Sequence, residues 1–91
     1  MKIGIIGFGN LGRALAAGLI KSNCAGPGDI FVCESAPEVR LFAEREPYFA
    51  QASEEVNYVI SEAEVIFLIV HLAVRVRSSN PRLRLMRIQL I

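Results

Sequence analysis

The chain has few of the residues that build metal centres or disulfide frameworks, and it has no apolar run long enough for a membrane span. Its 91 residues include two cysteines, one histidine and no tryptophan. Because no second Cys or His pair completes a ligand set, we predict that no metal is bound. No apolar run approaches the roughly 20 residues of a membrane span, and Asn10 and Arg13 interrupt the stretch that resembles a signal peptide. We therefore expect a cytoplasmic protein with no membrane partner.

The two cysteines are expected to stay reduced. In the fold predicted below, Cys24 follows the first helix, whereas Cys33 ends the second strand at the opposite edge of the sheet. Their separation would then exceed the roughly 7 Å that a disulfide allows between Cα atoms. We interpret both as packing residues, which agrees with a reducing compartment.

Acidic residues are absent from the last part of the chain. Residues 1–64 carry five basic and nine acidic side chains, whereas residues 65–91 carry five arginines and no acid. These arginines have no aromatic residues interleaved with them and form no recognised nucleic-acid motif, so nucleic acid is not an expected partner. With 53% hydrophobic and 21% charged residues, the chain is typical of one small globular domain.

The most informative segment is KIGIIGFGNLG at residues 2–12, where an apolar run leads into the pattern G-x-G-x-x-G. Gly7 would allow a tight turn out of a strand, Gly9 would let an anion approach the backbone, and Gly12 would let the next helix lie close to the strand. The free N–H groups and the positive end of the helix dipole then favour a pyrophosphate. The alternative is an ordinary corner between a strand and a helix, without a ligand.

Helix and strand patterns alternate after the glycines. A helix with one apolar stripe is predicted first, followed by a strand at Ile30–Cys33. Pro37 suits the first turn of a second helix, which Pro47 ends. The two expected stripes comprise Leu11, Ala14, Leu15, Gly18 and Leu19 in the first helix, and Val39, Phe42 and Ala43 in the second.

A third strand is expected over residues 49–52 and a third helix after it, with Ser53 as its N-cap. The run VIFLIV at residues 65–70 predicts a strand covered on both faces, as in a parallel sheet. Together these elements predict an α/β fold, the mononucleotide-binding half of a Rossmann-type, doubly wound parallel sheet, with strand order 3-2-1-4. The ligand crevice would lie at the carboxyl ends of strands one and four.

Glu34 stands just past the second strand, 22 residues after Gly12. An acid at this position can accept hydrogen bonds from an adenosine ribose with free hydroxyls and would repel a 2'-phosphate, which favours NAD over NADP. The alternative is a solvated acid at a strand end. Ser35 and Arg40 keep NADP open as well, because a hydroxyl and a guanidinium near this loop could receive a phosphate.

These motifs carry a family resemblance over residues 1 to about 70. The runs IGFGNLGRALAAGLI, PGDIFVCESAPE, SEEV and EAEVIFLIV resemble the N-terminal cofactor domain of pyrroline-5-carboxylate reductase. That enzyme makes proline by hydride transfer from NAD(P)H to a cyclic imine. The resemblance implies an oxidoreductase with NADP or NAD as its cofactor. Members of the family more often use NADPH, and Glu34 departs from that pattern.

The resemblance also implies which residues meet the cofactor. The turn after the first strand would line the pyrophosphate, the residues after the second strand would meet the ribose or its phosphate, and the end of the fourth strand would lie beside the cofactor. The implied residues are Ile6, Gly7, Phe8, Gly9, Asn10, Leu11, Gly12, Glu34, Ser35 and Val70.

From His71 onward the chain departs from the family. The family has Lys-Pro after the fourth strand, but this chain has His71 and Leu72, and nothing after them resembles the family's C-terminal helical domain. We therefore divide the chain into an NAD(P)-binding domain at residues 1–70 and a divergent, Arg-rich tail at residues 71–91. The catalytic residues are unknown, since no second catalytic group accompanies His71 as an acid or base. The chain alone is expected to be truncated and inactive; the alternative is a non-catalytic nucleotide-binding or interaction module with a basic tail.

The tail permits more than one structure. Arginines alternate with apolar residues on both sides of residues 78–81, as in a hairpin, but Asn80 and Pro81 could instead begin a short helix. We favour an out-of-frame or truncated gene end as its origin. Residues 65–70 would then lie at an open edge of the sheet, through which the chain could self-associate.

Overall fold

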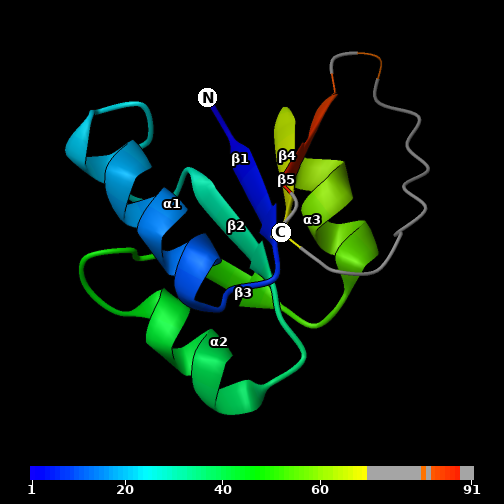
Figure 1. Cartoon of the computed structure of the whole chain (residues 1–91). Helices are drawn as coiled ribbons and strands as arrows, with labels where there is room; N and C mark the ends of the chain where they lie inside the picture. Colours follow the sequence, from blue (N-terminus) through cyan, green and yellow to red (C-terminus); the bar gives the residue numbers. More distant parts are fainter. Residues whose placement is uncertain (70–80, 82, 89–91) are drawn as a thin grey trace.

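A parallel sheet with helices on both faces forms the framework of the molecule (Figure 1). The computed structural model describes residues 1–69, 81 and 83–88. Its strands are β1 (Ile3–Ile6), β2 (Ile30–Cys33), β3 (Gln51–Ser53), β4 (Val65–Ile69) and β5 (Arg84–Ile88), and its helices are α1 (Asn10–Lys21), α2 (Pro37–Glu44) and α3 (Val56–Glu62). The strand order is β3-β2-β1-β4-β5, and every pairing is parallel. The predicted α/β, Rossmann-type half-domain is confirmed.

Side chains of the central strand β1 alternate between two cores. Ile3 and Ile5 pack on the face covered by α1 and α2, whereas Ile6 packs under α3 (Figure 1). Gly4 also faces α3, and a Cβ there would lie 2.7 Å from Cγ1 of Val59, so α3 rests on the backbone of β1. Full burial of each aliphatic side chain contributes about 1.5–3 kcal/mol to stability. Because its side chains enter both cores, β1 joins the two layers of helices.

The buried stripe of α1 is rotated from the predicted one. Two leucines of the predicted stripe, Leu15 and Leu19, pack against the sheet as expected. Ala14 and Gly18 are exposed. Gly12 and Ala16 are buried in their place. The cause is the close approach of the helix at Gly12, which turns this side of α1 toward the end of β1. In the described part of the chain no helix is long and apolar enough to cross a membrane.

The predicted stripe of α2 is right for Ala43, which is fully buried, but not for Phe42, which is 40% exposed. The guanidinium of Arg13 lies over the Phe42 ring, with 4.3 Å between the guanidinium carbon and the ring centroid. A cation at this distance from an aromatic ring is attracted to its face. The side chain of Phe42 thus joins α2 to α1 at the surface.

The third strand and helix begin later in the chain than predicted. Ser53 is not the N-cap of α3, because it still belongs to β3 and pairs with Cys33 of β2. Its hydroxyl oxygen accepts a hydrogen bond from the backbone N–H of Glu55 at 3.0 Å, and α3 begins at Val56. The serine therefore organises the turn before the helix.

The expected four-stranded sheet is wrong, because β5 pairs beside β4. Val65 lies opposite Arg84, and Ile69 lies opposite Ile88, in parallel register. A helix beginning at Asn80 is excluded over residues 84–88, while the first arm of the alternative hairpin lies outside the described residues. Addition of β5 satisfies the backbone groups that β4 would otherwise leave unpaired.

Candidate functional site

The turn between β1 and α1 has the geometry that the glycine spacing predicts. Gly7 has a φ of 97°, which a glycine adopts without the strain that a Cβ would cause. Gly9 is the N-cap of α1, in extended conformation and without a side-chain cap. The first turn of α1 contains no acidic residue, so its positive end faces the turn without an attached carboxylate.

Gly12 and Gly9 serve different purposes in this turn. A Cβ on Gly12 would collide with the carbonyl oxygen of Gly7, so only glycine permits this contact between helix and turn. A Cβ on Gly9 would meet no atom within 4 Å, which leaves open space beside the backbone. Gly12 fixes the packing of the helix, whereas Gly9 leaves the N–H groups open to the approach of a ligand.

The remaining predicted residues of the turn contribute in different ways. Phe8 is fully buried, and its ring meets that of Tyr48 edge-on at 5.2 Å between centroids. Ile6 is also buried, whereas Asn10 is exposed and Leu11 is half-buried. Because the side chains of Ile6 and Phe8 are buried, only the backbone of these two residues faces the turn. Val70 lies outside the described residues.

Glu34 follows β2 and touches the glycine turn directly. Its Oε1 accepts a hydrogen bond from the backbone N–H of Phe8 at 3.1 Å, and its Oε2 accepts one from the N–H of Ala36, also at 3.1 Å. Burial alone would raise the pKa of the Glu34 carboxyl, but hydrogen bonds from the N–H groups of Ala36, Phe8 and Ser35 and from the Ser35 hydroxyl lower it below its usual value. Glu34 is therefore a fixed, ionised carboxylate beside the turn.

Ser35 and Arg40 lie on the same loop. The exposed Ser35 hydroxyl is 3.4 Å from Oε2 of Glu34. Arg40, on α2, donates from Nη1 to the carbonyl oxygen of Glu34 at 2.8 Å and to that of Ser35 at 2.9 Å. The predicted pair of a hydroxyl and a guanidinium is thus present, with the guanidinium bound to the loop backbone.

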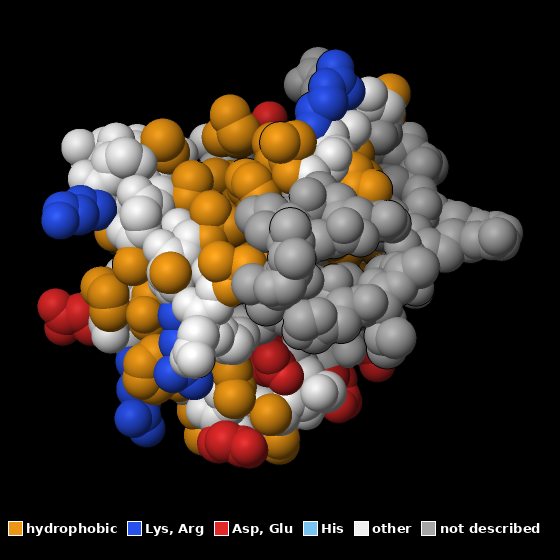
Figure 2. Space-filling model, viewed as in Figure 1, with side chains coloured by type: hydrophobic (Ala, Val, Ile, Leu, Met, Phe, Trp, Pro, Cys, Tyr) orange, Lys and Arg blue, Asp and Glu red, His pale blue; other side chains and the backbone are white. Residues whose placement is uncertain are grey.

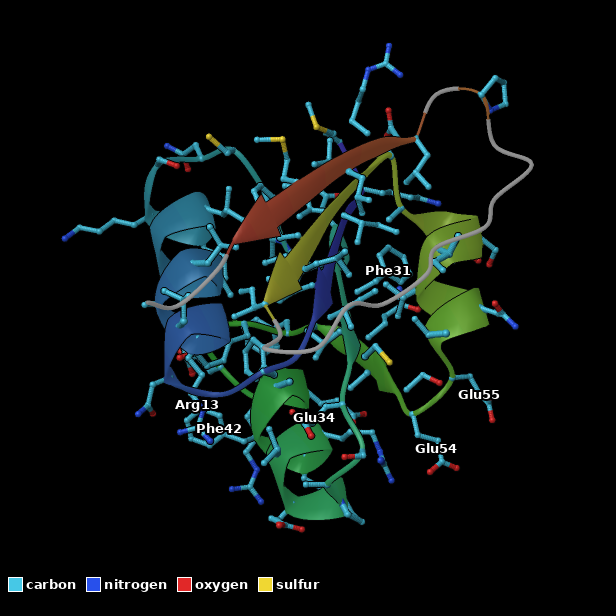
Figure 3. All side chains as sticks on the ribbon, turned by 45° about the vertical axis from the view of Figure 1, so that its right-hand side comes forward. Arg13, Phe31, Glu34, Phe42, Glu54 and Glu55 are labelled. Atoms are coloured by element: carbon cyan, nitrogen blue, oxygen red, sulfur yellow. The ribbon has the colours of Figure 1, made fainter. Side chains whose placement is uncertain are left out.

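Sequence reasoning missed the part of Arg13. Figure 3 shows its side chain beside Phe42, at the N-terminal end of α1. The Nε atom of Arg13 is buried and has no hydrogen-bond partner among the described residues. A cation near the positive end of a helix is unfavourable unless an anion is close, so Arg13 adds to the attraction of this end for anions. Its position directly after Gly12 was the available signal.

The cysteines do not form a reactive pair. Both are free, but Cys24 is exposed rather than packed. Burial, followed by the charges of Glu34 and Glu55, raises the pKa of the Cys33 thiol, and Arg40 lowers it by less. The thiol of Cys33 therefore stays protonated near neutral pH and is a poor nucleophile. The described residues contain no group of three or more His, Cys, Asp or Glu side chains placed to hold a metal ion.

An all-parallel sheet, a glycine turn at the end of β1 and an acid at the end of β2 define a Rossmann-type dinucleotide-binding half-domain. Residues 2–80 match the family described as NADP oxidoreductase, coenzyme F420-dependent. The chain belongs to this family, and membership implies that it binds NAD(P).

Individual relatives agree with the predicted resemblance. Pyrroline-5-carboxylate reductase of Escherichia coli (strain K12) is 38% identical over 66 residues, which cover 72% of this chain and 24% of the relative. The reductase of the same name from Shigella flexneri gives the same values. ComE operon protein 4 of Bacillus subtilis (strain 168) is 33% identical over 70 residues, 77% of this chain and 26% of the relative. The chain spans about a quarter of the length of these relatives.

Proposed function

We propose that this chain is the cofactor-binding part of an NAD(P)H-dependent oxidoreductase that reduces pyrroline-5-carboxylate, a cyclic imine, in proline biosynthesis. The observation that carries this proposal is the hydrogen bond between the Phe8 N–H and the Glu34 carboxylate, 3.1 Å long. It brings the acid at the end of β2 to the phosphate-binding turn, as a site for an adenosine ribose and a pyrophosphate requires. The relatives named above support the choice of substrate.

Each predicted residue has a proposed role. Backbone groups of Ile6, Gly7, Phe8, Gly9, Asn10, Leu11 and Gly12 would surround the pyrophosphate, which the positive end of α1 attracts. Glu34 and Ser35 would meet the adenosine ribose, and Val70 would lie beside the cofactor. The ionised Glu34 favours a ribose with free hydroxyls and disfavours a 2'-phosphate, so we propose a preference for NAD(H) over NADP(H).

This chain alone is proposed to be inactive in hydride transfer. Hydride transfer requires the imine carbon to be held about 3–3.5 Å from the nicotinamide, and such positioning contributes several kcal/mol to lowering the barrier. We propose that residues 1–70 bind the cofactor in the cytoplasm, that residues 71–91 diverge from the relatives, and that these 91 residues alone do not hold the substrate at the nicotinamide.

Calorimetric titration with NADH and with NADPH tests the site. We expect wild-type protein to bind, NADH more tightly, and Gly9→Val to lose binding because its side chain fills the space beside the turn. Glu34→Ser should shift preference toward NADPH. Unchanged affinity of the Gly9→Val variant would refute the phosphate site. If Glu34→Ser leaves the ratio of the NADH and NADPH dissociation constants unchanged, Glu34 lies outside the ribose site.

A spectrophotometric assay of NAD(P)H oxidation with pyrroline-5-carboxylate tests the activity. We expect no useful turnover from this chain. A rate near 1 per second, within the ordinary enzyme range of roughly 1–1,000 per second, would show that the chain or its oligomer builds a substrate pocket by itself. Binding without turnover even in the presence of a complete C-terminal domain would instead favour the second candidate, a non-catalytic nucleotide-binding module with a basic tail.

A further inference from the structure

Arg40 holds the loop that presents Glu34. The loop between β2 and α2 consists of residues 34–36, and two of its three carbonyl groups, those of Glu34 and Ser35, accept from Nη1 of Arg40 at 2.8 Å and 2.9 Å. The backbone N–H of Arg40 donates to the third carbonyl, that of Ala36, at 3.1 Å. One residue of α2 therefore binds every carbonyl of the loop.

The same loop sets the direction of the Glu34 carboxylate. That carboxylate accepts from Ala36 inside the loop and from Phe8 in the glycine turn, each at 3.1 Å. Both bonds depend on where the peptide groups at Glu34 and Ser35 lie, because rotation of either peptide would move the carboxylate or the Ala36 N–H. By fixing their carbonyl oxygens, Arg40 fixes the orientation of both peptides.

Arg40 acts on the backbone of the loop and not on the charge of Glu34. No ion pair joins the Arg40 guanidinium to the Glu34 carboxylate, and the bonds that reach this carboxylate come from other residues. Within the described part of the chain, Nη1 is also the only guanidinium nitrogen of Arg40 that forms a hydrogen bond. The side chain is half-buried, so this arrangement is shielded in part from water.

We propose that Arg40 is a positioning residue for ribose recognition, which holds Glu34 toward the adenosine ribose and so raises the selectivity of the site for NAD(H) over NADP(H). This inference rests on the proposed function, in which Glu34 meets the ribose. It predicts an effect that passes through Glu34 and disappears when the Glu34 charge is removed.

The test compares dissociation constants of NADH and NADPH, measured by calorimetry, for wild type, Arg40→Met, Arg40→Lys, Glu34→Gln and the double variant Glu34→Gln with Arg40→Met. Arg45→Met is the matched control, because Arg45 is exposed just after α2 and its loss removes the same charge without touching the loop. Circular dichroism and thermal unfolding report whether each variant is folded.

Arg40→Met should weaken NADH binding about fivefold to tenfold, which is the scale of one lost hydrogen bond, and change NADPH binding less than twofold. Arg40→Lys keeps a donor for the carbonyls and replaces Arg40→Met in the comparison if the methionine variant does not fold. The ratio of its NADPH and NADH dissociation constants should lie between the ratios of wild type and Arg40→Met. In the Glu34→Gln background, Arg40→Met should leave the ratio of the two constants unchanged.

Other results overturn the inference in distinguishable ways. A larger loss for NADPH than for NADH would show that Arg40 contacts the 2'-phosphate itself. Equal losses for both nucleotides, or a ratio that also changes in Arg45→Met, would reduce Arg40 to a general structural or electrostatic role. If wild type binds neither nucleotide, the proposed function fails and this inference with it, whereas wild-type binding with an unchanged ratio overturns the inference alone.

Discussion

At the scale of single residues, the candidate site depends on the missing Cβ atoms of two glycines and on one carboxylate that a loop holds in place. Gly12 lets α1 contact the carbonyl of Gly7, and the open space at Gly9 lies beside the same turn. Glu34 then joins the turn to the loop after β2 through the Phe8 N–H. Changes at these residues therefore affect stability and nucleotide binding to different degrees, which separates their roles.

Two alanine substitutions in α1 should act in opposite directions. Gly12→Ala places a Cβ against the Gly7 carbonyl oxygen and should lower the free energy of unfolding by about 1–3 kcal/mol, as overpacking does, and should also weaken nucleotide binding. Gly18→Ala is the matched control, because no atom lies within 4 Å of its added Cβ. It should stabilise the helix by about 0.5–1 kcal/mol. Urea unfolding measures both, and a Gly12→Ala variant as stable as wild type would contradict the close contact.

The pH dependence of stability should carry a contribution from Glu34. Because the folded-state pKa of Glu34 is lowered, the unfolded chain takes up the proton first, and the contribution is present above the unfolded pKa of about 4.3. It is lost as the pH falls through the folded-state pKa. Wild type should therefore exceed Glu34→Gln in stability at pH 7 by more than at pH 3. Urea unfolding at both pH values measures this difference in stability. A difference that does not change with pH would contradict a lowered pKa of Glu34 in the folded protein.

At the scale of secondary-structure elements, β5 is the feature that most changes the expected domain. It continues the sheet beyond β4 in parallel register, and its first residue is anchored by a hydrogen bond from the Arg84 N–H to the Glu64 carbonyl oxygen at 2.8 Å. The side chain of Arg84 is exposed, so the backbone rather than the guanidinium makes this link. Among the strands of the described residues, β5 is therefore the one at this edge of the sheet.

A proline at Arg84 should weaken this link without affecting a buried side chain. Arg84→Pro removes the N–H that Glu64 accepts and should lower the free energy of unfolding by about 1 kcal/mol, the net value of one hydrogen bond. Arg84→Ala keeps the N–H and should stay within about 0.5 kcal/mol of wild type. Hydrogen exchange should show faster exchange of the β5 amides in the proline variant only. Equal exchange in the two variants would argue against the pairing.

At the scale of the whole molecule, apolar surface remains beside the sheet edge. Leu85 is 47% exposed and Met86 52% exposed on β5. Figure 2 shows hydrophobic side chains gathered on the face between α1 and β5. Exposed apolar side chains along a strand edge favour pairing with another chain. The self-association expected at β4 is therefore proposed at β5 instead.

Sedimentation velocity over a range of concentrations tests this proposal. We expect wild type to associate, and the double variant Leu85→Lys with Met86→Lys to shift toward monomer, because charges on an edge strand oppose pairing. Leu41→Lys is the control, since Leu41 is 57% exposed on α2, away from β5. A wild type that stays monomeric at high concentration would exclude association through this edge.

The sequence by itself determined the features that depend on neighbouring residues. Spacing of Gly7, Gly9 and Gly12 predicted the turn, because a positive φ and a missing Cβ are local requirements. The bounds of β2 were also predicted correctly, since a short β-branched and aromatic run lies between a loop and Pro37. The α/β order followed from the alternation of these local patterns.

Only the tertiary structure decided which distant groups meet. The Phe8 N–H and the Glu34 carboxylate are 26 residues apart, and the sequence placed Glu34 at a strand end without showing that it reaches the turn. The rotation of α1 followed from a collision that Gly12 avoids, and the strand at β5 followed from the unpaired backbone of β4. Each of these depends on the packing of elements that are separate in the chain, because hydrogen bonds and steric contacts act through space rather than along the sequence.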